Sequence, residues 1–120
     1  VSLKGAGQSA TTITSADAIP SPGFTPSTPD WKLMHHGSLI QLVSPGYSGP
    51  SPHYGDPALM IASVNGNQTV SDLTLDGNAK KIKAGLWMLN RNNVTVHHVS
   101  FKNFQMRGAV LARSDMWWYV

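Results

Sequence analysis

Residues 58–78 read ALMIASVNGNQTVSDLTLDGN, and they align without a gap on residues 84–104, AGLWMLNRNNVTVHHVSFKNF. The shift is 26 positions (58 to 84), and it places Asn67 on Asn93. Repeats of this length indicate supersecondary units that stack on one another. Each copy carries short alternating apolar runs separated by Asn and Gly. This pattern predicts one coil of a parallel β-helix per repeat.

Working outward from the repeat, the same alternation predicts further strands and no helix. A third copy, slightly shortened, begins at Gly108, which is equivalent to Gly85. We expect strands at 59–63, 68–75, 86–90, 94–101, 109–112 and 116–119, with earlier strands inside 1–13 and at 38–43. Between them lie two loops rich in Pro and Gly, at about 14–36 and 45–57. Alternation directs one set of apolar side chains inward: Met60, Ala62, Val70, Leu73, Leu75, Leu86, Met88, Val96, Val99 and Phe101.

Composition limits the functions that this chain can serve. Its 120 residues suffice for one domain, with a formal net charge of +3 and a pI near 9.5. Cysteine is absent, which excludes a disulfide framework and thiol chemistry. No basic motif with a known docking geometry occurs, and no stretch is long enough to span a membrane. We therefore expect neither a nucleic-acid partner nor a membrane partner.

Both ends of the chain have the composition of strands. Residues 1–4 read as a strand, and the run 116–120 stops inside another. A β-helix open at both ends would expose two unpaired sheet edges, which proteins normally cover. We expect residues 1–120 to form a single β-helix domain that is an excerpt of a longer chain, or whose ends are covered by partners.

Stacking of successive repeats predicts ladders of side chains about 4.8 Å apart. Asn67 would lie under Asn93, where stacked amides tolerate left-handed backbone. Asp72 would lie beside His98, and Asp76 beside Lys102. Opposite charges on adjacent strands favour one register, so we interpret these pairs as structural.

The same acidic residues also suit a polysaccharide lyase, in which carboxylates hold Ca²⁺ on a uronate and Lys or Arg removes a proton. Against this, Asp72 and Asp76 each face a base rather than another carboxylate. Glycoside hydrolysis needs two carboxyl groups at a set separation, and no adjacent Asp pair occurs in the chain. We expect no cofactor, with Ca²⁺ required only if the chain belongs to a lyase.

The histidines form two neighbouring pairs, 35–36 and 97–98, with His53 in the second loop. Neighbours on a regular strand point to opposite faces, so neither pair is expected to chelate one metal by itself. The sequence therefore predicts no metal site.

Large aromatic residues fall on the outward positions of the predicted strands. If Leu86 points inward, Trp87 points outward, in a column with Ile61 and Leu111. A second outward column would hold Thr69, Thr95 and Trp117. An exposed indole offers a flat platform for a sugar ring, and polar neighbours can bind hydroxyl groups. The predicted carbohydrate-binding residues are Trp87, Trp117, Tyr119, Asn90, Arg91, His97 and Arg113. The alternative is that the outward Trp residues are covered by the loops or by another part of a larger protein.

Two segments carry a resemblance to a known superfamily. LKGAG at 3–7 followed by TTI at 11–13 resembles the opening coil of pectate-lyase-like right-handed β-helices. VSDLTLDGN at 70–78 and NNVTVHHVSF at 92–101 resemble their internal coils. The resemblance implies an all-β chain folded as a right-handed single-stranded parallel β-helix of about four to five coils. The resemblance is specific for fold but not for activity, because lyases, hydrolases, epimerases, phage tailspikes and binding modules share this fold.

Within that superfamily the chain is most similar to the short β-helical carbohydrate-binding modules attached to bacterial xylanases. The resemblance implies a secreted or cell-surface, non-catalytic module that binds a plant cell-wall polysaccharide, with xylan the best single guess. Its partners would be the polysaccharide and a covalently linked catalytic or additional β-helix domain. Two alternatives stay open: a segment of a β-helical lyase or glycoside hydrolase, and structural coils of a phage tailspike or adhesin.

Overall fold

The described residues of the protein form two β-sheets. A computed structural model describes residues 2–16, 37–43, 64–79, 82–89, 91–112 and 117–119, and these residues contain strands and turns but no helix. Each sheet has four strands. Sheet A contains β1 (Ser2–Lys4), β2 (Thr12–Thr14), β4 (Val64–Asp76) and β6 (Arg91–Lys102); sheet B contains β3 (Ser38–Val43), β5 (Ala84–Leu89), β7 (Arg107–Ala112) and β8 (Trp117–Tyr119).

The two long strands of sheet A pair in parallel with the register that the repeat predicts. Thr69 pairs with Thr95, Val70 with Val96 and Leu75 with Phe101, and each pair joins equivalent positions of the two repeats. The predicted repeat alignment is confirmed from Gln68 onward, whereas Val64 and Asn65 pair with Arg91 and Asn92, one residue further along than predicted, because the register shifts between Asn65 and Gln68. Both strands begin earlier than the predicted positions 68 and 94. They start at Val64 and Arg91, which pair with each other.

Two short strands share the other edge of β4. β1 pairs in parallel with residues 69–71, and β2 pairs in parallel with residues 74–76. Residues 5–11 connect β1 to β2 and pass opposite only two residues of β4, Asp72 and Leu73. The backbone of this connection is tied to β4, because the N–H of Gly5 bonds the carbonyl of Ser71 and the N–H of Gly7 bonds the carbonyl of Asp72.

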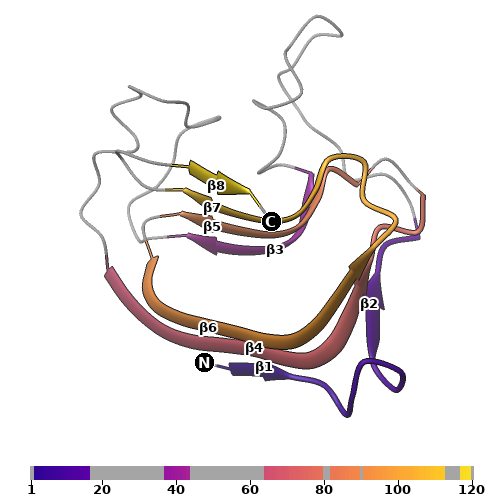
Figure 1. The fold of residues 1–120 in the computed structure, drawn as a ribbon, viewed down its shortest axis with the longest axis horizontal. Helices are drawn as coiled ribbons and strands as arrows, with labels where there is room; N and C mark the ends of the chain where they lie inside the picture. The colour runs from indigo at the N-terminus through magenta and orange to yellow at the C-terminus, as the bar shows by residue number, and fades with distance from the viewer. Residues whose placement is uncertain are drawn as a thin grey trace, which may run out of the picture.

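Left-handed residues interrupt β4 and β6 at matched positions. Asn67 and Asn93 have φ of 47° and 54°, and Asp72 and His98 have φ of 57° and 50°. Asn, Asp and His are the non-glycine residues most often found in this region of backbone space. Because the interruptions recur at equivalent positions of the two repeats, the two strands bend together (Figure 1).

Sheet B lies across the fold from β4 and β6 (Figure 1). Its ladder from β5 to β7 is parallel, and its shift is shorter than that of sheet A, since Ala84 pairs with Arg107 and Leu86 with Ala109. This shorter shift confirms the shortened third repeat. It also means that Val110, not the predicted Leu111, pairs with Trp87.

The last strand corrects one of the predicted columns. β8 runs antiparallel to β7, with Trp117 paired to Ala112 in sheet B. The prediction that Trp117 continues the Thr69–Thr95 column of sheet A is therefore wrong. The column assumed that the parallel stacking persists through residues 117–119, whereas the chain reverses before β8.

The core lies between the two sheets. It contains Val70, Leu73 and Leu75 from β4, with Leu86, Met88 and Ala109 from sheet B. Ile13, Val96, Val99 and Phe101 are among the half-buried side chains that pack against it. The predicted inward orientation is confirmed for Val70, Leu73, Leu75, Leu86, Met88, Val96, Val99 and Phe101. The predicted Met60 and Ala62 lie outside the described residues. Each fully buried aliphatic side chain contributes about 1.5–3 kcal/mol.

Sheet B is covered on both faces at β5, where all six residues are buried. Leu86 and Met88 belong to the core, so alternation places Trp87 and Leu89 on the opposite face. Trp87 is only 1 % exposed. Apolar residues on both faces are usual for a parallel strand that is buried on both sides.

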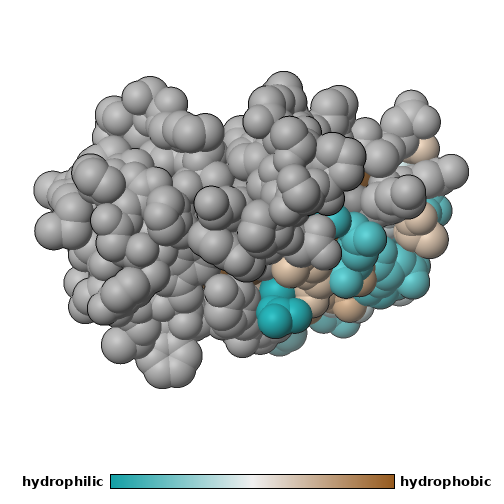
Figure 2. Space-filling view, turned by 90° about the horizontal axis from the view of Figure 1, so that it is seen from above, coloured by the Kyte–Doolittle hydropathy of each residue, from teal (hydrophilic) through white to brown (hydrophobic). Residues whose placement is uncertain are grey.

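The part of the surface that carries described residues is mixed in polarity. In the view of Figure 2, hydrophilic and hydrophobic residues of the described part lie side by side rather than in separate patches. Among the described residues, no helix is long and apolar enough to cross a membrane.

Candidate functional site

The outer face of sheet A carries a strip of polar side chains. On β6, exposure alternates along the strand, so that Asn93, Thr95 and His97 are exposed while Val94 and Val96 are half-buried. The equivalent residues of β4 extend the strip by one strand. On β4, Asn67 is exposed and Thr69 and Asp72 are half-buried, whereas Ser71 is buried. We define the polar strip as Asn67, Thr69 and Asp72 on β4 with Asn93, Thr95, His97 and His98 on β6.

Asp72 lies where loop 5–11, β4 and β6 meet. Its backbone carbonyl accepts the N–H of Gly7 at 2.8 Å. One carboxylate oxygen, Oδ2, accepts a hydrogen bond from the Ser71 hydroxyl at 2.8 Å, and Ser71 is buried. These contacts orient the carboxylate so that its other oxygen, Oδ1, lies 3.5 Å from Nδ1 of His98. The predicted pairing of Asp72 with His98 is confirmed.

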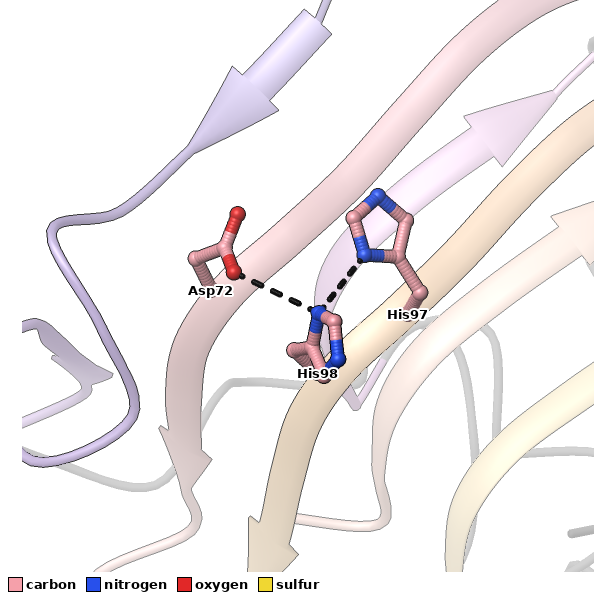
Figure 3. A group of neighbouring side chains, drawn as sticks. All are labelled: Asp72, His97 and His98. Atoms are coloured by element: carbon pink, nitrogen blue, oxygen red, sulfur yellow. Dashed lines mark hydrogen bonds and ion pairs between the residues drawn. The ribbon is translucent and has the colours of Figure 1, made fainter.

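His97 and His98 converge on the same side of β6. Their Nδ1 atoms lie 3.0 Å apart, and the rings meet nearly edge to face at 80°. The prediction that these neighbours point to opposite faces is wrong. It assumed a regular pleat, but the left-handed backbone of His98 interrupts the pleat and turns its ring toward that of His97 (Figure 3).

The three side chains form one cluster of potential metal ligands. Asp72, His97 and His98 each offer one ligand atom, and all three atoms lie within 4.8 Å of one another. Both imidazoles are exposed and Asp72 is half-buried. The cluster can take up a cation with nitrogen and oxygen ligands, or it can form a hydrogen-bonded chain in which the Nδ1 of His98 interacts with either neighbour.

A second charged pair occurs further along the same two strands. Lys102 Nζ lies 3.4 Å from Oδ2 of Asp76, as the ladder predicts. The side-chain amide of Asn103 and the backbone N–H of Asn78 both donate to Oδ1 of Asp76 at 2.8 Å. The Asn103 bond, then the Asn78 bond and the charge of Lys102, lower the pKa of Asp76 below its ordinary value of 3.8. Because every Asp76 oxygen has a partner, this pair is structural.

Among the residues predicted to bind carbohydrate, the structure describes the side chains of Trp87, Arg91 and His97. His97 is exposed on the polar strip, and Arg91 is half-buried at the start of β6. Trp87 is buried, so its indole is not an open platform. For Trp87 this agrees with the alternative that the outward Trp residues are covered. Of Trp117 and Tyr119 the structure describes only the backbone of β8, and Asn90 and Arg113 lie outside the described residues.

The sequence predicts a structural role for Asp72 and His98, and a role in catalysis only if the chain belongs to a lyase. Asp72 and His98 were recognised as a ladder pair, but His97 was assigned separately to carbohydrate. One feature of the sequence indicates the cluster. Asp72 and His98 are one repeat apart, and both are residue types that tolerate left-handed backbone. That spacing places a bend at His98, and a bend brings consecutive side chains together.

Comparisons with protein-family models, with curated proteins and with solved structures give no match, so the interpretation of this chain rests on its own geometry.

Proposed function

We propose that the chain is part of a right-handed parallel β-helix of about four to five coils, similar to the pectate-lyase-like fold, and that it binds polysaccharide without cleaving it. The ligand would be a plant cell-wall polysaccharide, with xylan the first to test. The observation that carries the proposal is the polar strip: exposed hydroxyl, amide and imidazole groups follow one another along an extended strand.

The strand registers support the β-helical part of the proposal. In sheet A and in sheet B, parallel ladders join equivalent positions of successive repeats, as in a chain that returns to the same sheet once per repeat. Each return stacks equivalent residues, and the shared core between the sheets would then run along the axis of the stack.

The polar strip suits an extended polymer. Successive exposed residues on one face of a strand are about 6.6 Å apart, twice the rise per residue. Asn93, Thr95 and His97 therefore present a row of hydrogen-bonding groups. The formal net charge of +3 would favour chains that carry uronate groups. With Trp87 buried, recognition on the described part of this face would depend on hydrogen bonds rather than on a stacked indole.

The charges on sheet A favour binding over catalysis. Asp72 lies against His98, and Asp76 lies against Lys102 and Asn103. A hydrolase needs two carboxyl groups that face the same bond, and a calcium-dependent lyase needs several carboxylates around one ion. Neither arrangement occurs among the described residues of this face.

Affinity gel electrophoresis against soluble xylan, pectin and alginate tests the proposal, with reducing ends and unsaturated products measured in the same mixtures. We expect retarded migration in at least one gel and no new products. New reducing ends or a new 4,5-double bond would show an enzyme. The absence of both retardation and products would contradict the polysaccharide proposal and favour a structural segment, which light scattering would reveal as a trimer or fibre.

Variants then test the polar strip itself. Thr95→Ala with His97→Ala removes two exposed hydrogen-bonding groups, each contributing about 0.5–1.5 kcal/mol, so affinity should fall about fivefold or more. Gln105→Ala is the matched control, because Gln105 is exposed and does not belong to the strip. Equal affinity of the double variant and the control would remove the strip as the binding surface.

A further inference from the structure

We propose that Asp72, His97 and His98 form a binding site for Zn²⁺ on the outer face of sheet A. The proposal rests on the geometry of these three side chains and is independent of polysaccharide binding. The cluster combines two imidazoles and one carboxylate, contributed by neighbouring strands, and Asp72 and His98 occupy equivalent positions of the two repeats.

The spacing of the ligand atoms fits a small tetrahedral cation. Bonds of about 2.0–2.1 Å at tetrahedral angles require ligand atoms about 3.3 Å apart. Nδ1 of His97 and Nδ1 of His98 are 3.0 Å apart, and Nδ1 of His98 and Oδ1 of Asp72 are 3.5 Å apart. Two of the three separations are therefore close to the tetrahedral value, and the third lies within 4.8 Å, so rotation of the exposed imidazole of His97 would have to bring its nitrogen nearer to the carboxylate.

The kind of ligand selects zinc over calcium. Two imidazole nitrogens and one carboxylate oxygen are a usual set of three protein ligands for Zn²⁺, with water at the fourth position. Calcium takes six to eight oxygen atoms, and this cluster offers one carboxylate. The side chain of His98 is 75 % exposed, so water can reach the open position.

The surroundings hold the carboxylate in place before an ion arrives. The Ser71 hydroxyl bonds Oδ2 of Asp72 and leaves Oδ1 facing His98. Loop 5–11 fixes the backbone, through the bond from the N–H of Gly7 to the carbonyl of Asp72. Outer contacts of this kind orient metal ligands and raise affinity.

Backbone conformation alone does not account for the cluster. Left-handed φ explains why Asp and His are tolerated at positions 72 and 98, but Asn would serve equally well there. His97 is not left-handed, yet its Nδ1 meets that of His98. Asp72→Asn and His98→Asn therefore serve as test variants, because each keeps a residue that tolerates left-handed backbone and removes one metal ligand.

Isothermal titration of the untagged full chain with ZnCl₂ tests the site, and cobalt substitution reports the coordination by visible absorption. We expect one Zn²⁺ per chain, and loss of at least about tenfold in affinity in Asp72→Asn, His97→Gln and His98→Asn, since even outer contacts cost that much. Asp76→Asn is the matched control, because Asp76 lies on the same strand with Lys102 and no histidine partner. Millimolar Ca²⁺ should not compete.

Three outcomes would overturn the proposal. They are no Zn²⁺ binding by the native chain, binding that persists in all three ligand variants, and a loss in Asp76→Asn as large as in the ligand variants. Circular dichroism of each variant establishes that it is folded. Should one fail to fold, the imidazole resonances of the native chain decide: Zn²⁺ must shift those of His97 and His98. The polysaccharide gels are then repeated with EDTA. Retardation that is unchanged when the metal is removed would show that the two proposals stand or fall separately.

Discussion

The side-chain amide of Asn93 donates a hydrogen bond to the side-chain oxygen of Asn67, its equivalent one repeat earlier. Both residues have left-handed backbone, with φ of 54° and 47°. The contact therefore joins two bends of the chain at the edge of the polar strip. The residue at the first bend, Asn67, thus accepts a hydrogen bond from the residue at the second, Asn93.

Replacing Asn93 with alanine or glycine separates the two contributions of this residue. Asn93→Ala loses the hydrogen bond. It also places alanine in left-handed backbone, where its side chain cannot make the local hydrogen bonds that favour Asn, and this strain costs about 1–2 kcal/mol. Asn93→Gly loses only the bond and should cost less. Urea unfolding measures both. A glycine variant as unstable as the alanine variant would show that backbone conformation is not the main term.

Gly85 lies where sheet B meets the turn after β6. A Cβ at this position would approach the carbonyl oxygen of Gly108 to 2.7 Å and a ring carbon of Phe101 to 2.8 Å. A backbone carbonyl cannot move away cheaply, so Gly85→Ala should destabilise the fold by about 1–3 kcal/mol or more. Thermal unfolding followed by circular dichroism checks this. An unchanged midpoint would mean that β5 and β7 are further apart than described.

Trp87 should behave as a core residue in mutagenesis. It is 1 % exposed, so Trp87→Ala should cost about 3–5 kcal/mol of stability. Leu111→Ala is the control on the neighbouring strand, because Leu111 is 39 % exposed and should change stability by about 0.5 kcal/mol or less. Denaturant titration compares them. A stable Trp87→Ala variant that loses polysaccharide binding would restore Trp87 as a stacking platform.

Asp76 makes stability depend on pH in the acid range. Its pKa is lower in the folded chain than its ordinary value of 3.8, so the unfolded chain binds protons first as the pH falls. The contribution of Asp76 is therefore complete above that ordinary value and is lost as the pH drops through the lowered folded pKa. Asp76→Asn removes the titrating group while keeping a side chain that can accept hydrogen bonds.

Unfolding by urea at a series of pH values from about 6 to 2.5 tests this linkage. The native chain should lose more stability over that interval than Asp76→Asn does. Parallel curves for the two proteins would contradict a lowered pKa. Asp72→Asn, measured alongside, shows whether any difference is specific to the Asp76–Lys102–Asn103 contacts.

Periodicity predicted the parts of the fold that depend on repetition. The register of β4 on β6 from Gln68 onward follows from the repeat shift, because stacked strands place equivalent residues together. The inward set around Leu73 follows from the apolar alternation within each repeat. The shift could not predict β8, whose antiparallel pairing with β7 reverses the stacking direction. Nothing in the residues of that strand encodes direction, since side-chain alternation is the same in parallel and antiparallel strands.

The candidate site was only partly predictable for a related reason. The partner of Asp72 followed from the repeat, but the approach of His97 to His98 depends on a left-handed residue inside a strand. Alternation assumes that every residue is extended. Likewise, alternation predicted that Trp87 leaves the core face, but not that the opposite face is covered.

The repeats differ in length at one corner. The connection from Asp76 to Ala84 is longer than the equivalent connection from Lys102 to Arg107. Because of this difference, the paired residues of β4 and β6 in sheet A are further apart in sequence than those of β5 and β7 in sheet B. Loop 5–11 similarly adds length opposite only two residues of β4. Chain length therefore varies at the corners while the ladder of β4 and β6 keeps one register from Gln68 onward. The corners are consequently the sites at which a peptide could be grafted into this protein, as an epitope or a new binding loop, without disturbing the strands that carry it.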